Sequence, residues 1–182
     1  RSALNLGDVR RVLRGVGLVT IVIEVLVALV LLVRFRVTYG YSWGSATWHG
    51  VFHSVTAFNN AGFSLYADSL TGFATDAVVT GAIAVAIIIG GLGFPVLVDL
   101  YANRGTRRWG RLALHSRFTL VATVVLIAAG FCIFLVAEWH NPGTIGQDSV
   151  VQKVWVSFFG SVTPRTAGFN SVDVGAMTDT GL

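Results

Sequence analysis

Charge is scarce in this chain. Of its 182 residues, 12% are Asp, Glu, Lys or Arg and 54% are hydrophobic, whereas soluble domains carry about 25% charged residues. A composition so poor in charge excludes a disordered chain, a nucleic-acid-binding tail and most soluble enzymes. The surplus of apolar residues requires a solvent other than water, and a lipid bilayer is the obvious one.

Cysteine is almost absent as well. Cys132 is the single cysteine, so no disulfide can form within the chain and the sequence does not encode a redox compartment. We expect Cys132 to be an inert packing residue. The sequence begins with Arg1 rather than Met, and we therefore expect a fragment or a processed product.

Long apolar runs dominate the remainder. Two of them, 77–98 and 118–137, lack any charged residue, and a third, 15–33, is interrupted only by Glu24. A helix of about 20 residues crosses a hydrocarbon core of about 30 Å. We predict an all-α integral membrane fold with spans over 15–33, 75–100 and 118–137. Glu24 is either a functional intramembrane carboxylate or a protonated or hydrogen-bonded packing residue.

The second apolar run carries the sequence Gly90-Gly91-Leu92-Gly93-Phe94-Pro95. Glycine and proline are common in membrane helices, where small residues allow close packing and proline introduces a kink. We interpret this segment as a packing kink, with a functional hinge as the alternative.

A different kind of segment lies over 37–67, which contains no Asp, Glu, Lys or Arg but holds several glycines, two histidines, two asparagines and many hydroxyl residues. Such a neutral, half-polar stretch suits neither lipid nor bulk water. Irregular backbone at membrane depth is tolerated where it is buried in protein or lines a water-filled cavity. We predict a short re-entrant helix followed by an irregular loop within 43–66, and a second such unit within 150–171.

Basic residues cluster in 1–14 and 101–117, which together carry nine of the thirteen Lys and Arg residues. Cytoplasmic loops are enriched in Lys and Arg, so both segments are placed in the cytosol and the spans between them alternate. Arg34 and Arg36, at the outer end of the first span, are interpreted as interfacial. The linker 101–117 is a candidate contact for a regulatory partner or for anionic lipid headgroups. Nucleic acid is not an expected partner.

An internal repeat makes the sequence more specific. Ser-Val-Thr occurs at 54–56 and 161–163, offset by 107 residues, and Ala-Gly-Phe occurs at 61–63 and 167–169, offset by 106 residues. Each copy follows a predicted span and a short helix. Internal repeats of this kind are typical of transporters and channels.

The physical chemistry of that unit favours a monovalent cation. A loop of backbone carbonyl groups can replace the hydration shell of such an ion without fixed charge. The loop needs unusual backbone angles, which glycine adopts at low cost, and the partly negative C-terminus of the preceding helix favours a cation. Calcium sites usually employ carboxylates, and neither loop contains one.

The segments 57–64 and 161–171 closely resemble pore loops of the Trk/Ktr/HKT superfamily of potassium transporters, most closely those of the bacterial Ktr-type membrane subunit. The segments 90–95 and 111–116 are similar to the same family. The resemblance implies four span–pore-helix–filter-loop–span repeats around one pore. This chain matches the second repeat and most of the third, so it would not enclose a complete pore.

The resemblance also implies function and partners. It implies passive potassium movement, with sodium as a candidate activator and no cofactor in this chain. It further implies a multi-pass protein of the bacterial plasma membrane that is a homodimer and binds a cytosolic nucleotide-sensing subunit. Carried over by motif, potassium would bind at the backbone carbonyl groups of eight residues, namely Asn59, Asn60, Ala61, Gly62, Arg165, Thr166, Ala167 and Gly168.

The expected organisation follows from these assignments. It comprises a cytosolic basic segment 1–14, a pore repeat 15–100 (span 15–33, pore helix and loop 43–66, span 75–100), a cytosolic basic linker 101–117 and a partial repeat 118–182 (span 118–137, pore helix and loop 150–171, following span missing). Arg165 is expected to turn its side chain away from the ion and to pair with Asp148 or Asp173.

Two other functions stay open at this point. An intramembrane metalloenzyme would use Glu24 with His49 and His53, which are spaced to share one helix face. No Cys, Asp or Glu near the histidines in the sequence completes a zinc site, so polar packing of the pore helix is favoured for them. A purely structural membrane subunit is the other alternative, although a lipid-packed scaffold has little use for two polar loops.

Overall fold

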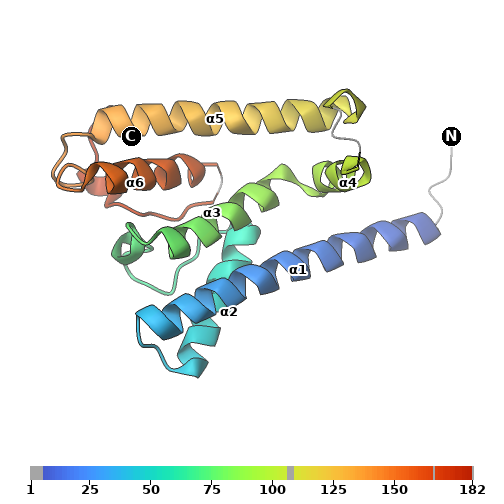
Figure 1. Ribbon diagram of the computed structural model, residues 1–182, viewed down its shortest axis with the longest axis horizontal. Helices are drawn as coiled ribbons and strands as arrows, with labels where there is room; N and C mark the ends of the chain where they lie inside the picture. Colours follow the sequence, from blue (N-terminus) through green and yellow to red (C-terminus); the bar gives the residue numbers. More distant parts are fainter. Residues whose placement is uncertain (1–5, 106–108, 166, 182) are drawn as a thin grey trace.

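The computed structural model describes residues 6–105, 109–165 and 167–181, and over these ranges it is helical without strands (Figure 1). Within these ranges the six α-helices occur as three consecutive pairs, and a short 3₁₀ turn follows each pair. In chain order they are α1 (Leu6–Thr38), α2 (Trp43–Phe58), η1 (Thr71–Phe73), α3 (Ala77–Leu92), α4 (Phe94–Asn103), η2 (Trp109–Arg111), α5 (Leu114–Glu138), α6 (Val150–Val162) and η3 (Val174–Ala176).

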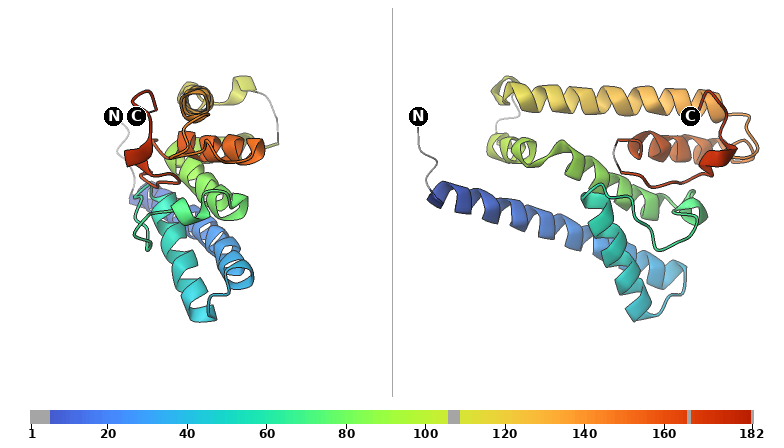
Figure 2. Two further views of the ribbon diagram at one scale, coloured as in Figure 1. Left: turned by 90° about the vertical axis from the view of Figure 1, so that its left-hand side faces the viewer. Right: turned by 180° about the vertical axis from the view of Figure 1, so that it is seen from behind.

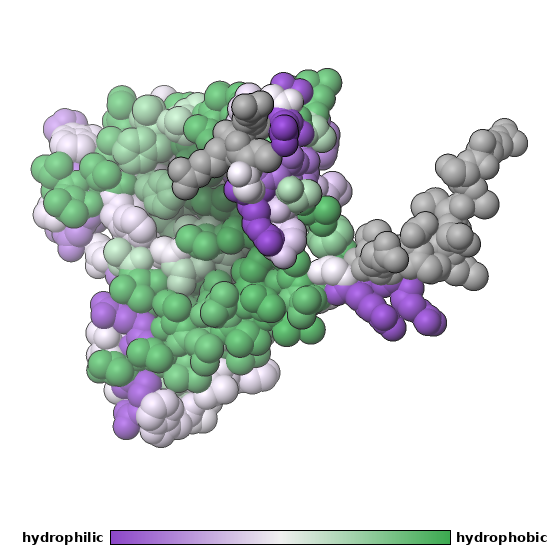
Figure 3. Space-filling model, turned by 45° about the vertical axis from the view of Figure 1, so that its right-hand side comes forward, coloured by the Kyte–Doolittle hydropathy of each residue, from purple (hydrophilic) through white to green (hydrophobic). Residues whose placement is uncertain are grey.

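Two of these helices are long and apolar enough to cross a membrane, over Leu13–Thr38 and Leu114–Glu138. Their outward faces carry exposed aliphatic and aromatic side chains, among them Leu18, Ile21, Leu29, Phe118, Val124 and Ile133. Figure 3 shows the result as a broad hydrophobic surface with hydrophilic residues gathered towards its edges. Such a surface is stable only in lipid or against further protein. The prediction of an all-α membrane fold is confirmed.

The first helix is longer than the span expected over 15–33, because it begins at Leu6 and continues to Thr38. The hydropathy pattern marks only the part of a helix that suits lipid. Helix geometry continues beyond that part, because arginine is a good helix former. Arg34 and Arg36 consequently lie on the last turns of α1 rather than after it.

The span expected as one helix over 75–100 is instead two helices, α3 and α4, whose axes differ by 93°. Gly93 separates them with φ = 79°, and Pro95 lies in the first turn of α4. Glycine adopts positive φ at low cost and proline is favoured at the start of a helix. The Gly-Pro segment therefore ends one helix and starts another, which is a sharper change than a packing kink.

Two structurally similar units build the molecule, α1 with α2 and α5 with α6 (Figures 1 and 2). Ser42 caps α2 through a bond from the Ser45 N–H to its hydroxyl (3.2 Å), and Ser149 caps α6 through the Gln152 N–H (3.4 Å). Such serine caps satisfy backbone N–H groups at a helix start. The two caps are 107 residues apart, the same offset as the Ser-Val-Thr copies.

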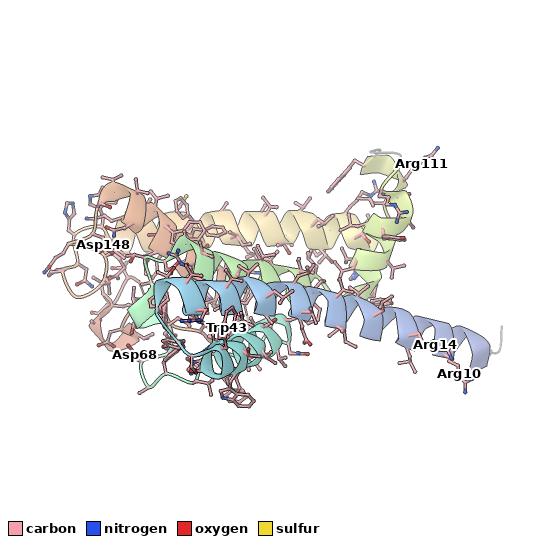
Figure 4. All side chains as sticks on the ribbon, turned by 60° about the horizontal axis from the view of Figure 1, so that its bottom comes forward. Arg10, Arg14, Trp43, Asp68, Arg111 and Asp148 are labelled. Carbon is pink, nitrogen blue, oxygen red and sulfur yellow. The ribbon has the colours of Figure 1, made fainter. Side chains whose placement is uncertain are left out.

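The described parts of the two basic segments lie at the same end of the molecule. Figure 4 shows Arg10 and Arg14 on α1 and Arg111 before α5 at one end, with Asp68 and Asp148 at the other. In Figure 1, α4 and the start of α5 lie at the end where α1 begins. The structure thus gives the basic segments the common side that the charge pattern predicts.

The largest core lies where the two units meet. It contains Leu31 and Phe35 from α1 and Ile83 from α3, together with Phe159 and Phe169 from the second unit, all fully buried or nearly so. The Trp155 indole of α6 donates a hydrogen bond to the Thr80 hydroxyl of α3 (2.8 Å), which joins the second unit to α3. The core therefore holds the end of α2 and the end of α6 beside α3.

Candidate ion filter

The first loop begins where α2 ends in a left-handed turn. Asn60 has φ = 51°, its N–H donates to the Ala57 carbonyl (3.1 Å), and the Ala61 N–H donates to the Thr56 carbonyl (2.8 Å). This is the Schellman pattern, with asparagine at the position that usually favours glycine. Gly62 follows with φ = 70°, so the chain turns sharply at the pore-helix C-terminus.

The second loop begins at the end of α6. The N–H groups of Ala167 and Gly168 both donate to the Thr163 carbonyl, at 3.0 and 3.3 Å. Gly168 has φ = 76°, close to the value at Gly62. Gly62 and Gly168, the glycines of the two Ala-Gly-Phe copies and hereafter the signature glycines, therefore both occupy a region of backbone angles that residues with a side chain rarely adopt. Thr166, which is also among the predicted filter residues, lies outside the described residues.

The two loops touch at these glycines. A Cβ atom placed on Gly62 would lie 2.8 Å from the Gly168 Cα atom and would overlap the Ala167 carbonyl oxygen. A Cβ atom on Gly168 would lie 3.5 Å from the Gly62 Cα atom. The structure thus brings together two loops that are about a hundred residues apart in the sequence.

Several carbonyl groups of the predicted filter residues have no hydrogen-bond donor among the described residues. These are the carbonyl oxygens of Asn59, Asn60, Ala61 and Gly62 in the first loop, and of Ala167 and Gly168 in the second. The carbonyl groups that flank them are used, as Thr56 and Ala57 accept the turn bonds at the end of α2. A run of unused carbonyl groups at a helix C-terminus is suited to a cation.

The threonine of each Ser-Val-Thr motif makes the same contact in both units. The Thr56 hydroxyl donates to the Phe63 carbonyl (3.1 Å), and the Thr163 hydroxyl donates to the Phe169 carbonyl (2.5 Å). The repeated motif is visible in the sequence, but this role of its threonine is not predicted there. The signal was present in the fixed order of Ser-Val-Thr and Ala-Gly-Phe in both copies.

The serine of the motif packs the pore helix on its own span. The Ser54 hydroxyl donates to the Glu24 backbone carbonyl of α1 (2.6 Å), and the Cβ atom of Ser161 would lie 3.3 Å from a Cβ placed on Gly130 of α5. The serine of the motif therefore lies against the span of its own unit in both copies.

Beyond the predicted filter residues, hydrogen bonds join the two loops. The Leu70 N–H donates to the Asn170 carbonyl (2.8 Å), and the Asn170 N–H donates to the Ser69 hydroxyl (3.0 Å). Ser69 has φ = 59°. Sequence reasoning missed this pairing, because contacts between distant loops leave no periodic pattern.

Glu24, which the sequence left open, reaches the first predicted filter residue. Its side chain accepts a hydrogen bond from the Asn59 amide nitrogen (2.9 Å), and the same nitrogen donates to the Val55 carbonyl (2.9 Å). The carboxylate therefore lies at the C-terminal end of the pore helix. A lone acid within an apolar run was the signal for it.

Arg165 makes a different contact from the one expected. Its guanidinium donates to the Thr123 hydroxyl of α5 (3.0 Å). Among the described residues neither Asp148 nor Asp173 forms an ion pair with it, so that expectation is wrong. The guanidinium therefore reaches the span that packs against its own pore helix.

In the described structure His49 and His53 make packing contacts and do not form a metal site. His53 is fully buried, its Nδ1 lies 2.8 Å from the His49 carbonyl, and its Nε2 lies 3.3 Å from the Ser64 hydroxyl. The His53 ring stacks on Tyr66 with centroids 5.2 Å apart. Within the described ranges no three His, Cys, Asp or Glu residues are grouped to hold a metal, so Glu24 does not join the histidines.

The break between α3 and α4 lies against the first loop. A Cβ atom on Gly90 would overlap the Phe58 carbonyl oxygen at the end of α2, and one on Gly91 would lie 3.5 Å from the Asn60 amide nitrogen. Gly90 thus allows α3 to contact the end of α2, where the first loop starts. The chain then turns away through the 93° bend.

An ion pair joins the outer ends of α1 and α3. The Asp76 carboxylate accepts from the Arg34 guanidinium (2.9 Å) and the Tyr39 hydroxyl (2.8 Å), and it caps α3 through the Val78 and Val79 N–H groups. Burial favours the neutral acid, but these donors outweigh burial and hold the pKa of Asp76 below its usual value. The pKa of Tyr39 is raised to about 12, chiefly by burial and secondly by its hydrogen bond to Asp76.

Arg36, the second outer arginine, stacks over Trp43 with its guanidinium carbon 5.4 Å from the ring centroid. It also donates to the Tyr41 carbonyl (3.3 Å). Cation–π stacking and carbonyl bonds are ways to hold an arginine at an interface. The two arginines that oppose the charge pattern are therefore held by specific partners.

The TrkH family, described as cation transport protein, matches residues 1–182. The chain is 41% identical to the Ktr system potassium uptake protein B of Bacillus subtilis (strain 168) over 98% of its own length and 40% of that protein. It is 39% identical to the protein of the same name from Vibrio alginolyticus, over 77% of the chain and 30% of that protein.

It is also 35% identical to the potassium/sodium uptake protein NtpJ of Enterococcus hirae, over 100% of the chain and 40% of that protein. The chain spans less than half the length of these relatives. The predicted resemblance is confirmed, and the family does not favour the metalloenzyme alternative. With its long apolar helices, this chain is a multi-pass membrane segment that belongs to the TrkH family of cation transport proteins.

Proposed function

We propose that this chain forms part of a passive transmembrane pathway for potassium, in which backbone carbonyl groups of its two loops coordinate the ion. The observation that carries the proposal is the contact between Gly62 and Gly168, which places two runs of unused carbonyl groups side by side. Neutral carbonyl ligands suit a weakly hydrated monovalent cation. Relatives named for potassium uptake support that choice of ion.

The ligands are Asn59, Asn60, Ala61 and Gly62 with Arg165, Thr166, Ala167 and Gly168, as the motif resemblance implies. Two loops provide only part of a ring of carbonyl groups around an ion. The proposal therefore includes further repeats of the same polypeptide. The chain covers 40% of the length of the Bacillus subtilis relative, which leaves ample length for them.

The proposal extends to partners. The common end of the basic segments, with Arg10, Arg14 and Arg111, would face the cytosol by the positive-inside rule. There it would meet a nucleotide-binding regulatory subunit or anionic lipid headgroups. We further propose a homodimer, and sodium as an activator, in keeping with a relative named for potassium and sodium uptake.

Complementation tests the proposal. The complete protein is expressed in a bacterium that cannot grow on low potassium, and uptake of rubidium as a potassium substitute is measured with and without sodium. We expect growth to be restored by the wild type. We expect Gly62→Ser and Gly168→Ser to lose selectivity or uptake, because both positions have positive φ. Restored growth with unchanged selectivity in both variants would overturn the filter assignment.

A further inference from the structure

We propose that Thr56 and Thr163 are positioning residues that set the outer end of the filter. Each hydroxyl binds the carbonyl group directly after the signature glycine, that of Phe63 or Phe169. This inference rests on the proposed function and adds to it a pair of side chains that do not themselves touch the ion. The ion ligands end at the glycine because the threonine hydroxyl of the pore helix binds the carbonyl group of the next residue.

The use of carbonyl groups along the loops supports this boundary. Among the described residues, the carbonyl groups of Gly62 and Gly168 receive no hydrogen bond, whereas that of the following phenylalanine receives one in both units. A carbonyl engaged by a hydroxyl offers less negative charge to a cation, and its peptide plane is fixed in one orientation. The threonine therefore orients the peptide that follows each phenylalanine, Phe63–Ser64 or Phe169–Asn170, and thereby fixes where the ion-binding run ends.

The contact is preserved although the two loops differ in length. Six residues, 57–62, separate Thr56 from Phe63, and five, 164–168, separate Thr163 from Phe169. The second loop is one residue shorter because Thr163 is closer in the sequence to Ala167 than Thr56 is to Ala61. A contact that persists across loops of different length is not a simple copy of one loop geometry, so the hydroxyl-to-carbonyl bond is the common feature of the two units.

The two threonines are not equivalent. The Thr56 hydroxyl lies within bonding distance of three carbonyl groups, those of Phe52 (3.1 Å), His53 (3.3 Å) and Phe63 (3.1 Å). A hydroxyl has one proton to donate, so Thr56 divides it among them. For the Thr163 hydroxyl the described acceptor is the Phe169 carbonyl, and we therefore expect the second unit to depend more strongly on its threonine.

The test uses the complete protein and measures the ratio of rubidium to sodium transport. Valine has the shape of threonine without the hydroxyl, so Thr163→Val should lower the ratio by roughly two- to tenfold, as expected for one lost hydrogen bond. Thr163→Ser should restore it. Thr56→Val should have a smaller effect in the same direction, and it gives an independent test if Thr163→Val does not reach the membrane.

Thr47→Val is the matched control. The Thr47 hydroxyl donates to the Trp43 carbonyl within its own helix (2.8 Å), at the opposite end of α2 from the filter. The Thr47→Val variant should leave the ratio of rubidium to sodium transport unchanged. A valine variant that is present in the membrane with an unchanged ratio overturns the inference, and so does a ratio that Thr163→Ser fails to restore. Absence of uptake by the wild type would instead contradict the proposed function.

Discussion

Gly62 and Gly168 lie in contact at the junction of the two units, but they are not interchangeable. A side chain on Gly62 would run into the backbone of Ala167 and Gly168, whereas one on Gly168 would lie at an ordinary contact distance, 3.5 Å, from Gly62. Each has a positive φ that disfavours other residues. The first loop is thus the more tightly enclosed of the two.

From this asymmetry we expect Gly62→Ala to abolish potassium uptake and Gly168→Ala to reduce it partially. Both variants carry the cost of a left-handed residue, about 1–2 kcal/mol, but only the first also creates an overlap with backbone atoms. Rubidium uptake, normalised to protein in the membrane, measures the difference. Gly44→Ala is the control, because a Cβ there meets nothing within 4 Å. Equal losses in the two variants would contradict this reasoning.

Gly90 should tolerate substitution less well than its neighbour Gly91. An added Cβ on Gly90 overlaps the Phe58 carbonyl oxygen, while one on Gly91 lies 3.5 Å from the Asn60 amide nitrogen. Overpacking of this kind costs about 1–3 kcal/mol. We expect Gly90→Ala to lower the unfolding temperature of the detergent-solubilised protein, with Gly91→Ala close to wild type. If the order is reversed, α3 does not meet the end of α2 as described.

Glu24 and Asn59 should act as a pair. Glu24→Gln keeps an acceptor for the Asn59 amide and should retain uptake within about twofold, whereas Glu24→Leu removes the acceptor and should lose more, since one hydrogen bond contributes about 0.5–1.5 kcal/mol. Asn59→Leu should add little to Glu24→Leu, because contacting residues are not additive. A large loss in Glu24→Gln would show instead that the charge itself is required.

Asp76 should confer a pH-dependent part of the stability. Its pKa is held below the ordinary value of 3.8 in the folded state. Its contribution is therefore fully present above that value and is lost as the pH falls through the lower folded pKa. Unfolding temperatures measured from neutral pH to below about pH 4 should show this loss in the wild type.

Asp76→Ala should remove that step and, at neutral pH, cost about 1 kcal/mol or more, because the cap of α3 is lost as well. Asp148→Asn provides the control, since the Asp148 carboxylate makes no hydrogen bond or ion pair within the described ranges. A variant that keeps the acid-dependent step of the wild type would show that other carboxyl groups cause it.

The sequence alone determined the membrane environment, the positions of the two long apolar helices and the repeated motif. Apolar runs of about 20 residues favour helices in lipid, since a helix bonds its backbone groups within its own segment. The offset between the motif copies identified the repeated unit. These properties depend on composition and on the order of motifs, which are visible in one dimension, and the family followed from the resemblance of the segments 57–64 and 161–171 to known pore loops.

The tertiary structure decided which parts meet. That Gly62 touches Gly168, that Asn59 binds Glu24 and that Arg165 reaches Thr123 rather than an acid are contacts between distant segments. The first depends on the packing of α3 against both α2 and α6, and the other two on the packing of α2 against α1 and of α6 against α5, which no local pattern encodes. The 93° break likewise required the folded chain, because a Gly-Pro segment is compatible with a kink or a complete turn until its neighbours fix the direction of the next helix.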